Sequence, residues 1–104
     1  MPKIEAVHDG KDGTLIGYYF FCPGCQTLHG PMVAHSQGYK GPKWAFNGNL
    51  EKPTFSPSIL VYEHPTQPRC HSFVREGRIQ FLSDCGHELA GKTVDLPELP
   101  EWAQ

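Results

Sequence analysis

The feature that most restricts the fold of this chain is a pair of cysteines separated by two residues, Cys22-Pro23-Gly24-Cys25. Structural zinc is held by four thiolate or imidazole ligands, and a C-x2-C turn supplies two of them at once. Pro23 fixes its own φ angle, and Gly24 leaves room where backbone amides approach the sulfur atoms. The motif therefore predicts a structural metal site, and zinc is the expected cofactor.

The size and composition of the chain indicate that its fold needs the additional stability that such a site provides. Its 104 residues fit one domain, which we expect to span residues 1–104 as a single zinc-stabilised unit. Hydrophobic residues make up only 38% of the chain, and its 11 Gly and 10 Pro weaken regular elements. A domain with so limited a core needs a disulfide or a metal, and four Cys with six His offer either.

The cellular compartment decides between disulfides and metal. The N-terminal residues show no apolar run typical of a signal peptide, and the longest apolar stretches, 18–22 and 59–62, are too short to cross a membrane. We therefore expect a cytoplasmic protein, in which thiols stay reduced and paired cysteines bind metal. A thioredoxin-like redox motif is disfavoured because no helix is predicted after Cys25. The net charge of −2 makes nucleic acid and membranes unlikely partners.

The predicted fold is a small, mainly β domain of hairpins and long loops. Aromatic and β-branched residues 15–21 predict a strand that leads into the first cysteine, and residues 32–35 a short strand. Asn47-Gly48 predicts a tight hairpin over 43–50, residues 59–62 a strand, and 69–84 a hairpin turning at Glu76-Gly77. No helix longer than about two turns is expected. The predicted core consists of Phe20, Trp44, Phe55, Ile59, Phe73, Ile79 and Phe81.

Two further metal ligands must come from the rest of the chain. Cys70 and Cys85 are the strongest candidates, because four thiols without disulfides need a reason, although a lone cysteine is more often a buried apolar residue. The histidines His71 and His87 remain open, and His29 is a weaker candidate. His8, His35 and His64 are expected at the surface. The favoured ligands are Cys22, Cys25, Cys70, His71 and Cys85.

The register of the 69–84 hairpin decides which of these side chains share a face. A two-residue turn at Glu76-Gly77 places Val74 opposite Ile79 and puts Cys70 on the face of Cys85. A type I turn with Gly77 as a bulge residue shifts the register by one, and then His71 joins Cys85. The second register groups Phe73, Ile79 and Phe81 together and is therefore preferred.

Two enzyme motifs fail on inspection. His87-Glu88-Leu89-Ala90-Gly91 lacks the second histidine of H-E-x-x-H, and no H-x-E precedes the cysteine pair as zinc deaminases require. A polar cluster of His71, Ser72, Asp84, His87 and Glu88 could still surround an open zinc site, with Asp84 or Glu88 as general base. The structural alternative is that Asp84 caps a turn and that a histidine is a ligand.

Residues 44–58 form a second candidate site, because aromatic, amide and hydroxyl side chains lie on predicted turns there. The candidate binding residues are Trp44, Asn47, Thr54 and Ser56. The structural alternative, which we consider stronger, is that the aromatic rings form core and the polar groups satisfy turn amides.

Over residues 18–102 the chain resembles a family of small, uncharacterised proteins of tailed bacteriophages and prophages. The shared motifs are Cys-Pro-x-Cys followed by His29, Trp-x-Phe-Asn-Gly at 44–48, Pro-Thr-Phe-Ser-Pro-Ser-Ile at 53–59, and the cysteine- and histidine-rich segment 70–91. The resemblance implies zinc binding, with Cys22, Cys25, Cys70 and His71 as the oldest ligand set. Some members carry the label ammonia monooxygenase, which requires membrane-bound copper and does not fit these thiols.

The expected function is that of a non-enzymatic phage or prophage accessory protein, which binds a host or phage protein in the cytoplasm of the bacterial host. The alternative is a zinc-dependent hydrolase with its site around His71, Asp84 and His87. An open metal position would favour the enzyme, and four protein ligands would favour the binding protein.

Overall fold

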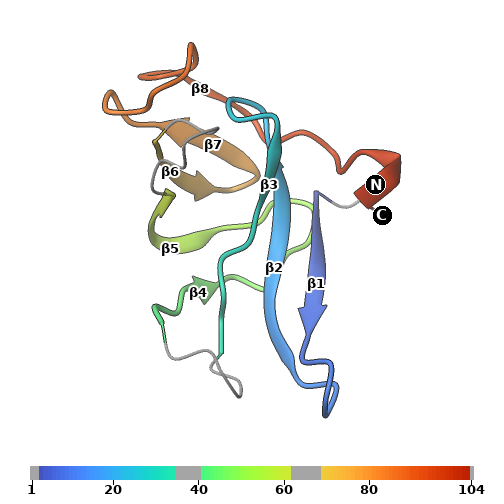
Figure 1. The fold of residues 1–104 in the computed structure, drawn as a ribbon. Helices are drawn as coiled ribbons and strands as arrows, with labels where there is room; N and C mark the ends of the chain where they lie inside the picture. The colour runs from blue at the N-terminus through green and yellow to red at the C-terminus, as the bar shows by residue number, and fades with distance from the viewer. Residues whose placement is uncertain (1–2, 35–40, 62–68, 104) are drawn as a thin grey trace.

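The computed structural model describes residues 3–34, 41–61 and 69–103, which form two antiparallel sheets (Figure 1). The first sheet has the strand order β1-β2-β3, and the second has the order β4-β5-β6-β7-β8. The elements are β1 (Ile4–His8), β2 (Leu15–Cys22), β3 (Thr27–His29), β4 (Ala45–Phe46), β5 (Phe55–Val61), β6 (Cys70–Arg75), β7 (Arg78–Phe81), β8 (Thr93–Asp95) and the 3-10 helix η1 (Glu101–Ala103). The prediction of a small, mainly β domain is confirmed.

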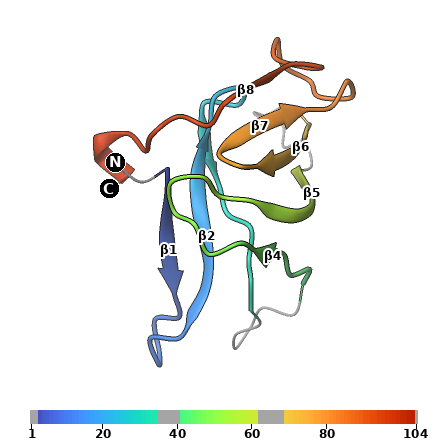
Figure 2. The same ribbon diagram turned by 180° about the vertical axis from the view of Figure 1, so that it is seen from behind.

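The long strand β2 is the centre of the first sheet and ends at the cysteine turn. It pairs with β1 on one side and with β3 on the other, so that Phe20 lies opposite both Ile4 and His29. The chain after β8 returns to this sheet, where the Tyr19 hydroxyl donates to the carbonyl of Ala103 over 2.7 Å. Seen from behind, the C-terminal segment runs across to the start of β1 (Figure 2). The strand β3 was not predicted, because its three residues have no alternating pattern.

The hairpin of β6 and β7 takes the register in which Val74 lies opposite Ile79. Glu76 and Gly77 both have positive φ angles, 50° and 76°, as a two-residue turn requires. Glu76 is held in this conformation because its N–H donates to Thr54 Oγ1 over 2.8 Å. The preferred bulged register was therefore wrong, since contacts from the 53–54 segment stabilise a turn that Glu76 would not adopt readily alone.

The hydrophobic core lies between the two sheets. Because side chains alternate along a strand, Cys70, Ser72 and Val74 of β6 point into this core while His71 and Phe73 lie on the outer face. The predicted core residue Phe73 is thus only partly buried, and the guanidinium of Arg75 lies 4.0 Å from its ring centroid. The buried cluster contains Ile4, Phe20, Cys22, Phe55, Ile59, Cys70, Val74, Ile79, Phe81 and Leu96, and Trp44 packs against it.

The tight hairpin predicted over 43–50 was wrong. The strand β4 pairs with β5, with Phe46 opposite Phe55, so the connection extends from 47 to 54. Asn47 and Asn49 stabilise this longer loop, because their side-chain oxygens accept hydrogen bonds from backbone amides within it. Met32 forms a single bridge to Gly17, while His35 and His64 lie outside the described residues. Within the described residues, no helix is long and apolar enough to cross a membrane.

Candidate functional site

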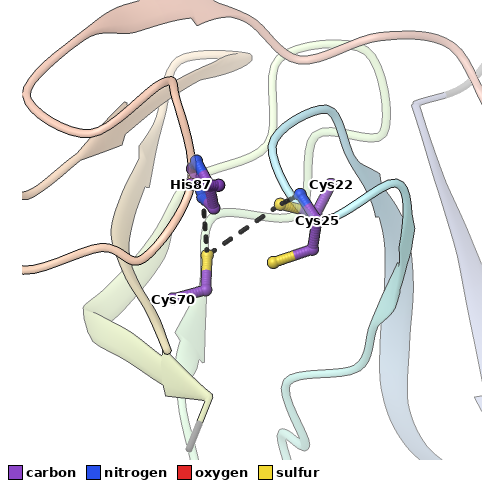
Figure 3. A group of neighbouring side chains, drawn as sticks. All are labelled: Cys22, Cys25, Cys70 and His87. Carbon is purple, nitrogen blue, oxygen red and sulfur yellow. Dashed lines mark hydrogen bonds between the residues drawn. The ribbon is translucent and has the colours of Figure 1, made fainter. Parts of the chain in front are cut away.

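Four side chains from both sheets converge at one end of the core. Cys22, Cys25, Cys70 and His87 offer ligand atoms that all lie within 4.8 Å of one another (Figure 3). The Cys70 Sγ is 3.9 Å from the Cys22 Sγ and 3.6 Å from His87 Nε2. The last residue of β2 and the turn after it contribute one thiol each, the first residue of β6 contributes the third, and the loop after β7 contributes the imidazole. This cluster could bind a metal ion.

The His87 ring is fixed against the cysteine turn. Its Nδ1 accepts a hydrogen bond from the N–H of Leu89 over 3.2 Å, and the His87 and Phe81 rings pack edge to face at 88° with their centroids 4.5 Å apart. A Cβ atom added at Gly24 would overlap the imidazole of His87. A larger residue at position 24 would therefore displace the ring, because the ring occupies the space that a side chain would fill.

The three thiols of the cluster differ in the direction in which their pKa values are shifted. A hydrogen bond from the Cys70 thiol lowers the pKa of Cys22 to about 6, and the same contact, followed by burial, raises the pKa of Cys70. Burial and then the nearby charge of Cys22 raise the pKa of Cys25 to about 11. Negative charge is thus concentrated at Cys22, and a cation would be needed to stabilise further thiolates there.

The other predicted ligands lie outside this group. The Cys85 Sγ accepts from the His71 N–H over 3.3 Å and donates to the His71 carbonyl over 3.1 Å. His29 is only 4% exposed, and neither ring nitrogen has a hydrogen-bond partner among the described residues. Burial, followed by the charge of His87, lowers the pKa of His29 to about 4. The ligand set stays a prediction, and the geometry favours His87 in the place given to His71 or Cys85.

A second constellation lies on the opposite face of the second sheet. The Ser58 Oγ is 3.0 Å from His71 Nε2, and His71 Nδ1 is 3.3 Å from Asp84 Oδ2. Because a carboxylate only accepts, the Nδ1–H of His71 donates to Asp84 and leaves Nε2 to accept the Ser58 proton. Three side chains that are distant in sequence thus form one continuous hydrogen-bonded chain of serine, histidine and acid.

An irregularity in β5 brings Ser58 to the histidine. Phe55 lies opposite Val74 and Ile59 opposite Ser72, so that four steps along β5 match only two along β6. The extra residues of β5 form a bulge, which redirects Ser58 out of the regular alternation. The indole Nε1 of Trp44 donates to the Ser58 carbonyl over 3.1 Å and fixes the backbone of this bulge.

The acid of this constellation has a second partner. The Arg69 Nε donates to the same oxygen, Asp84 Oδ2, over 3.1 Å. Desolvation acts to raise the pKa of Asp84, but the hydrogen bonds from Arg69 and then His71 outweigh it and hold the pKa below its usual range. Asp84 is therefore a carboxylate at neutral pH and fixes the tautomer of His71.

A family model matches residues 3–82, and its description reads "Bacterial ubiquitination-like system serine protease (BubE)". The match covers more than half of the chain. The chain belongs to the BubE family. The matched range includes Ser58 and His71 and ends two residues before Asp84. No curated protein and no solved structure matches the chain.

The BubE description corrects the expected function. The expected function of a non-enzymatic phage accessory protein is wrong, because the family is described as a protease. The alternative, a zinc-dependent hydrolase, shares hydrolysis with the family description but differs from it in chemical class, since that description names serine. The geometry agrees with this correction, because the cluster that was expected to surround an open zinc site divides. His87 joins the thiols, whereas His71 and Asp84 face Ser58.

Ser58 was missed in the sequence of this BubE member, because the segment 53–59 shows no motif that marks a nucleophile. The candidate binding residues nearby have structural partners: Trp44 holds the Ser58 carbonyl, Asn47 donates to Lys52, and Thr54 accepts from Glu76. Ser56 lies exposed in β5. Their role in binding stays a prediction.

Proposed function

We propose that this chain is a serine protease in which Ser58 is the nucleophile, His71 the general base and Asp84 the carboxylate that orients it. The single observation that supports this most is the unbroken chain of contacts from Ser58 to Asp84, at 3.0 and 3.3 Å. These distances lie within the reach that a nucleophile, its base and an orienting group need. The family description supplies the same chemical class independently.

The mechanism follows from the roles of these atoms. The Ser58 Oγ attacks the carbonyl carbon of the scissile amide while its proton moves to His71 Nε2. The imidazolium then donates this proton to the leaving nitrogen, and the acyl group remains on Ser58. Water, activated by the same histidine, releases the acid and regenerates the hydroxyl. Asp84 stabilises the imidazolium through the Nδ1–H and remains ionised throughout.

The substrate class follows from the family description. A serine protease of a bacterial ubiquitination-like system acts on polypeptide amide bonds, and we propose such a bond within a protein of that system as the substrate. The group of Ser58, His71 and Asp84 suits a protein substrate, because the Asp84 side chain is 42% exposed and that of His71 is 24% exposed. A docked polypeptide would remove these groups from water and strengthen their interaction.

We further propose that the metal centre binds zinc through Cys22, Cys25, Cys70 and His87. With zinc–sulfur bonds of about 2.3 Å, tetrahedral ligands are separated by about 3.8 Å, and the Cys22 and Cys70 sulfurs are 3.9 Å apart. Four protein ligands close the site, so the ion would stabilise the fold and leave the chemistry to Ser58. The four cysteines are free thiols, which supports a reducing compartment such as the cytoplasm.

The test uses a fluorophosphonate probe, which transfers its phosphonyl group to an activated serine. The Ser58 Oγ forms the P–O bond, fluoride leaves, and the proton passes to His71. Intact-mass measurement should show one probe per chain on the native protein and none on Ser58→Ala. Ser83→Ala, the same change on an exposed turn residue, should label at the native rate. Equal labelling of Ser58→Ala and the native protein would refute the assignment.

A further inference from the structure

The segment that follows β7 crosses the end of β6 and carries Asp84. The Leu82 N–H donates to the His71 carbonyl over 2.9 Å, and the Gly86 N–H donates to the Arg69 carbonyl over 2.8 Å. A turn closes between these contacts, because the Cys85 N–H donates to the Leu82 carbonyl over 3.2 Å. The segment is thus attached to β6 on both sides of Cys85.

The Cys85 thiol completes the pairing of His71 beyond the end of β7. The strand β7 ends at Phe81, which pairs with Ser72, and the next residue, Leu82, donates its N–H to the His71 carbonyl. The sulfur accepts from the His71 N–H over 3.3 Å and is a second donor to the His71 carbonyl over 3.1 Å. One side chain therefore contacts both backbone groups of the residue whose ring faces Ser58.

We infer that Cys85 is a positioning residue for the catalytic His71, an inference that rests on the proposed serine protease function. The thiol holds the backbone of His71 while the neighbouring residue, Asp84, holds its ring. A shift of Cys85 would therefore move the base and its orienting carboxylate together. Small displacements of catalytic groups reduce rates strongly, because the reacting atoms must stay within a narrow range of distance and angle.

This role separates Cys85 from the other three cysteines. Their sulfur atoms lie on the core side of the second sheet in the cluster with His87, whereas the Cys85 sulfur contacts the His71 backbone. The thiol acts here as a neutral donor and acceptor, which a hydroxyl can imitate and a methyl group cannot. Serine at position 85 should therefore preserve most of the function that alanine removes.

The experiment compares Cys85→Ala with Cys85→Ser in the full chain, using the rate of fluorophosphonate labelling at Ser58. We expect Cys85→Ala to lower the maximal labelling rate by about 10- to 100-fold with the half-saturating probe concentration unchanged. Cys85→Ser should recover a rate within about threefold of the native one, because one hydroxyl can make both hydrogen bonds. Both variants should retain the native metal content by mass spectrometry.

Val74→Ala is the control for a general loss of stability. Val74 is fully buried on the core face of the same strand and is not part of the triad. Val74→Ala should lower the melting temperature at least as much as Cys85→Ala does, and it should leave the labelling rate of Ser58 at the native value. The Nδ1–H proton signal of His71 in NMR spectra should be sharp in the native protein and in Val74→Ala, and broadened in Cys85→Ala.

Each other outcome is decisive. A native rate in Cys85→Ala, or an equal loss of rate in Val74→Ala, overturns the positioning role. Loss of the metal from Cys85→Ala would make Cys85 a ligand and also overturn it. These results are distinguishable from failure of the protease assignment, in which Ser58→Ala itself would still be labelled. If Cys85→Ala does not fold, a rate in Cys85→Ser as low as that of His71→Ala overturns the inference.

Discussion

Cys70 and His71 are neighbours in sequence, but they belong to opposite faces of the second sheet and to different environments. Cys70 is completely buried and joins three side chains that could hold a metal ion. His71 is partly exposed and joins Ser58 and Asp84. The loop after β7 repeats this division, because Asp84 faces the histidine and His87 faces the thiols. The same two segments thus supply both the candidate metal centre and the group of Ser58, His71 and Asp84.

The comparison shows that one strand can hold two sites with different requirements. Buried thiolates are costly without a cation, so an ion bound on the inner face would stabilise the fold. The outer face needs access for a substrate and tolerates exposure of its charges. Changes on the inner face should therefore affect stability first, and changes on the outer face should affect activity alone.

Loss of the metal should have the largest effect. Structural zinc sites bind with apparent free energies of about 10–16 kcal/mol, which is as large as the total stability of a small domain. Cys70→Ser, or a strong chelator added to the native protein, should therefore unfold the chain, and labelling of Ser58 should disappear with the fold. Circular dichroism melting and metal content measured together test this.

The matched variant for that prediction is Ser58→Ala on the outer face. It should keep the metal, melt within a few degrees of the native protein, and lose labelling completely. A chelated protein with an unchanged melting curve would contradict the stabilising role of the metal centre. Loss of metal from Ser58→Ala would contradict the independence of the two faces.

Removal of the orienting charge should come second. Asp84→Asn can donate from its amide to His71 Nδ1, which would place the ring proton on Nε2, where it cannot accept from Ser58. We expect the labelling rate to fall by about 10³- to 10⁴-fold with the free energy of unfolding changed by less than about 0.5 kcal/mol. The rate of fluorophosphonate labelling measures the loss of activity, and urea denaturation measures the change in the free energy of unfolding.

Asp95→Asn is the control for Asp84→Asn, because Asp95 also pairs with an arginine, Arg78, at the surface of the same sheet. This control should keep the native labelling rate. A similar loss of rate in both variants would mean that surface charge, and not the contact with His71, determines activity.

Acid should lower the free energy of unfolding through the buried side chain of His29. Burial, followed by the charge of His87, holds the folded-state pKa of His29 at about 4, below the usual value of 6.5. The unfolded chain therefore gains a proton that the folded chain lacks as the pH falls from 6.5 to 4, and stability decreases over that window. Between pH 7.5 and 4.5 the loss from this residue should be about 2–3 kcal/mol.

The measurement is urea denaturation of the native protein and of His29→Gln at several pH values. The variant keeps a polar side chain of similar size that does not titrate, so its stability should fall less steeply below pH 6.5. Both proteins keep the four proposed ligands, Cys22, Cys25, Cys70 and His87, so acid release of a metal bound there cancels in the comparison. Parallel slopes for the two proteins would show that His29 is not the group responsible.

The two sites differ in how far the sequence could predict them. The spacing of Cys22 and Cys25 predicts a metal site, and Cys70 is a predicted ligand because few other thiols remain. His87 could not be separated from His71, because the choice depends on which way the loop after β7 turns. The triad was hidden altogether, since Ser58 reaches His71 through a bulge that joins residues 13 positions apart.

The fold was predicted where local signals are strong and missed where neighbours decide. The strand predicted over 15–21 and the hairpin predicted over 69–84 match β2 and the pair β6 and β7, whereas the strand predicted over 59–62 covers only the end of β5, which begins at Phe55. The turn at Glu76-Gly77 was assigned to the wrong type, because its conformation depends on hydrogen bonds from Pro53 and Thr54. The Asn47-Gly48 signal failed for a similar reason, since β4 finds its partner in β5 beyond the turn.

The smallest effect that we predict tests the packing of the metal centre. In Gly24→Ala the new methyl group would overlap the His87 ring, which must then move away from Cys70. Such overpacking costs about 1–3 kcal/mol, so metal affinity, measured in competition with a chelator, should fall by about 10- to 100-fold at unchanged ligand identity. Gly10→Ala is the matched control, because nothing lies within 4 Å of a Cβ atom there. Native affinity in Gly24→Ala would mean that His87 is not held against the cysteine turn, and the fourth ligand would then have to be sought at His71 or Cys85, which would join the two faces that the structure keeps apart.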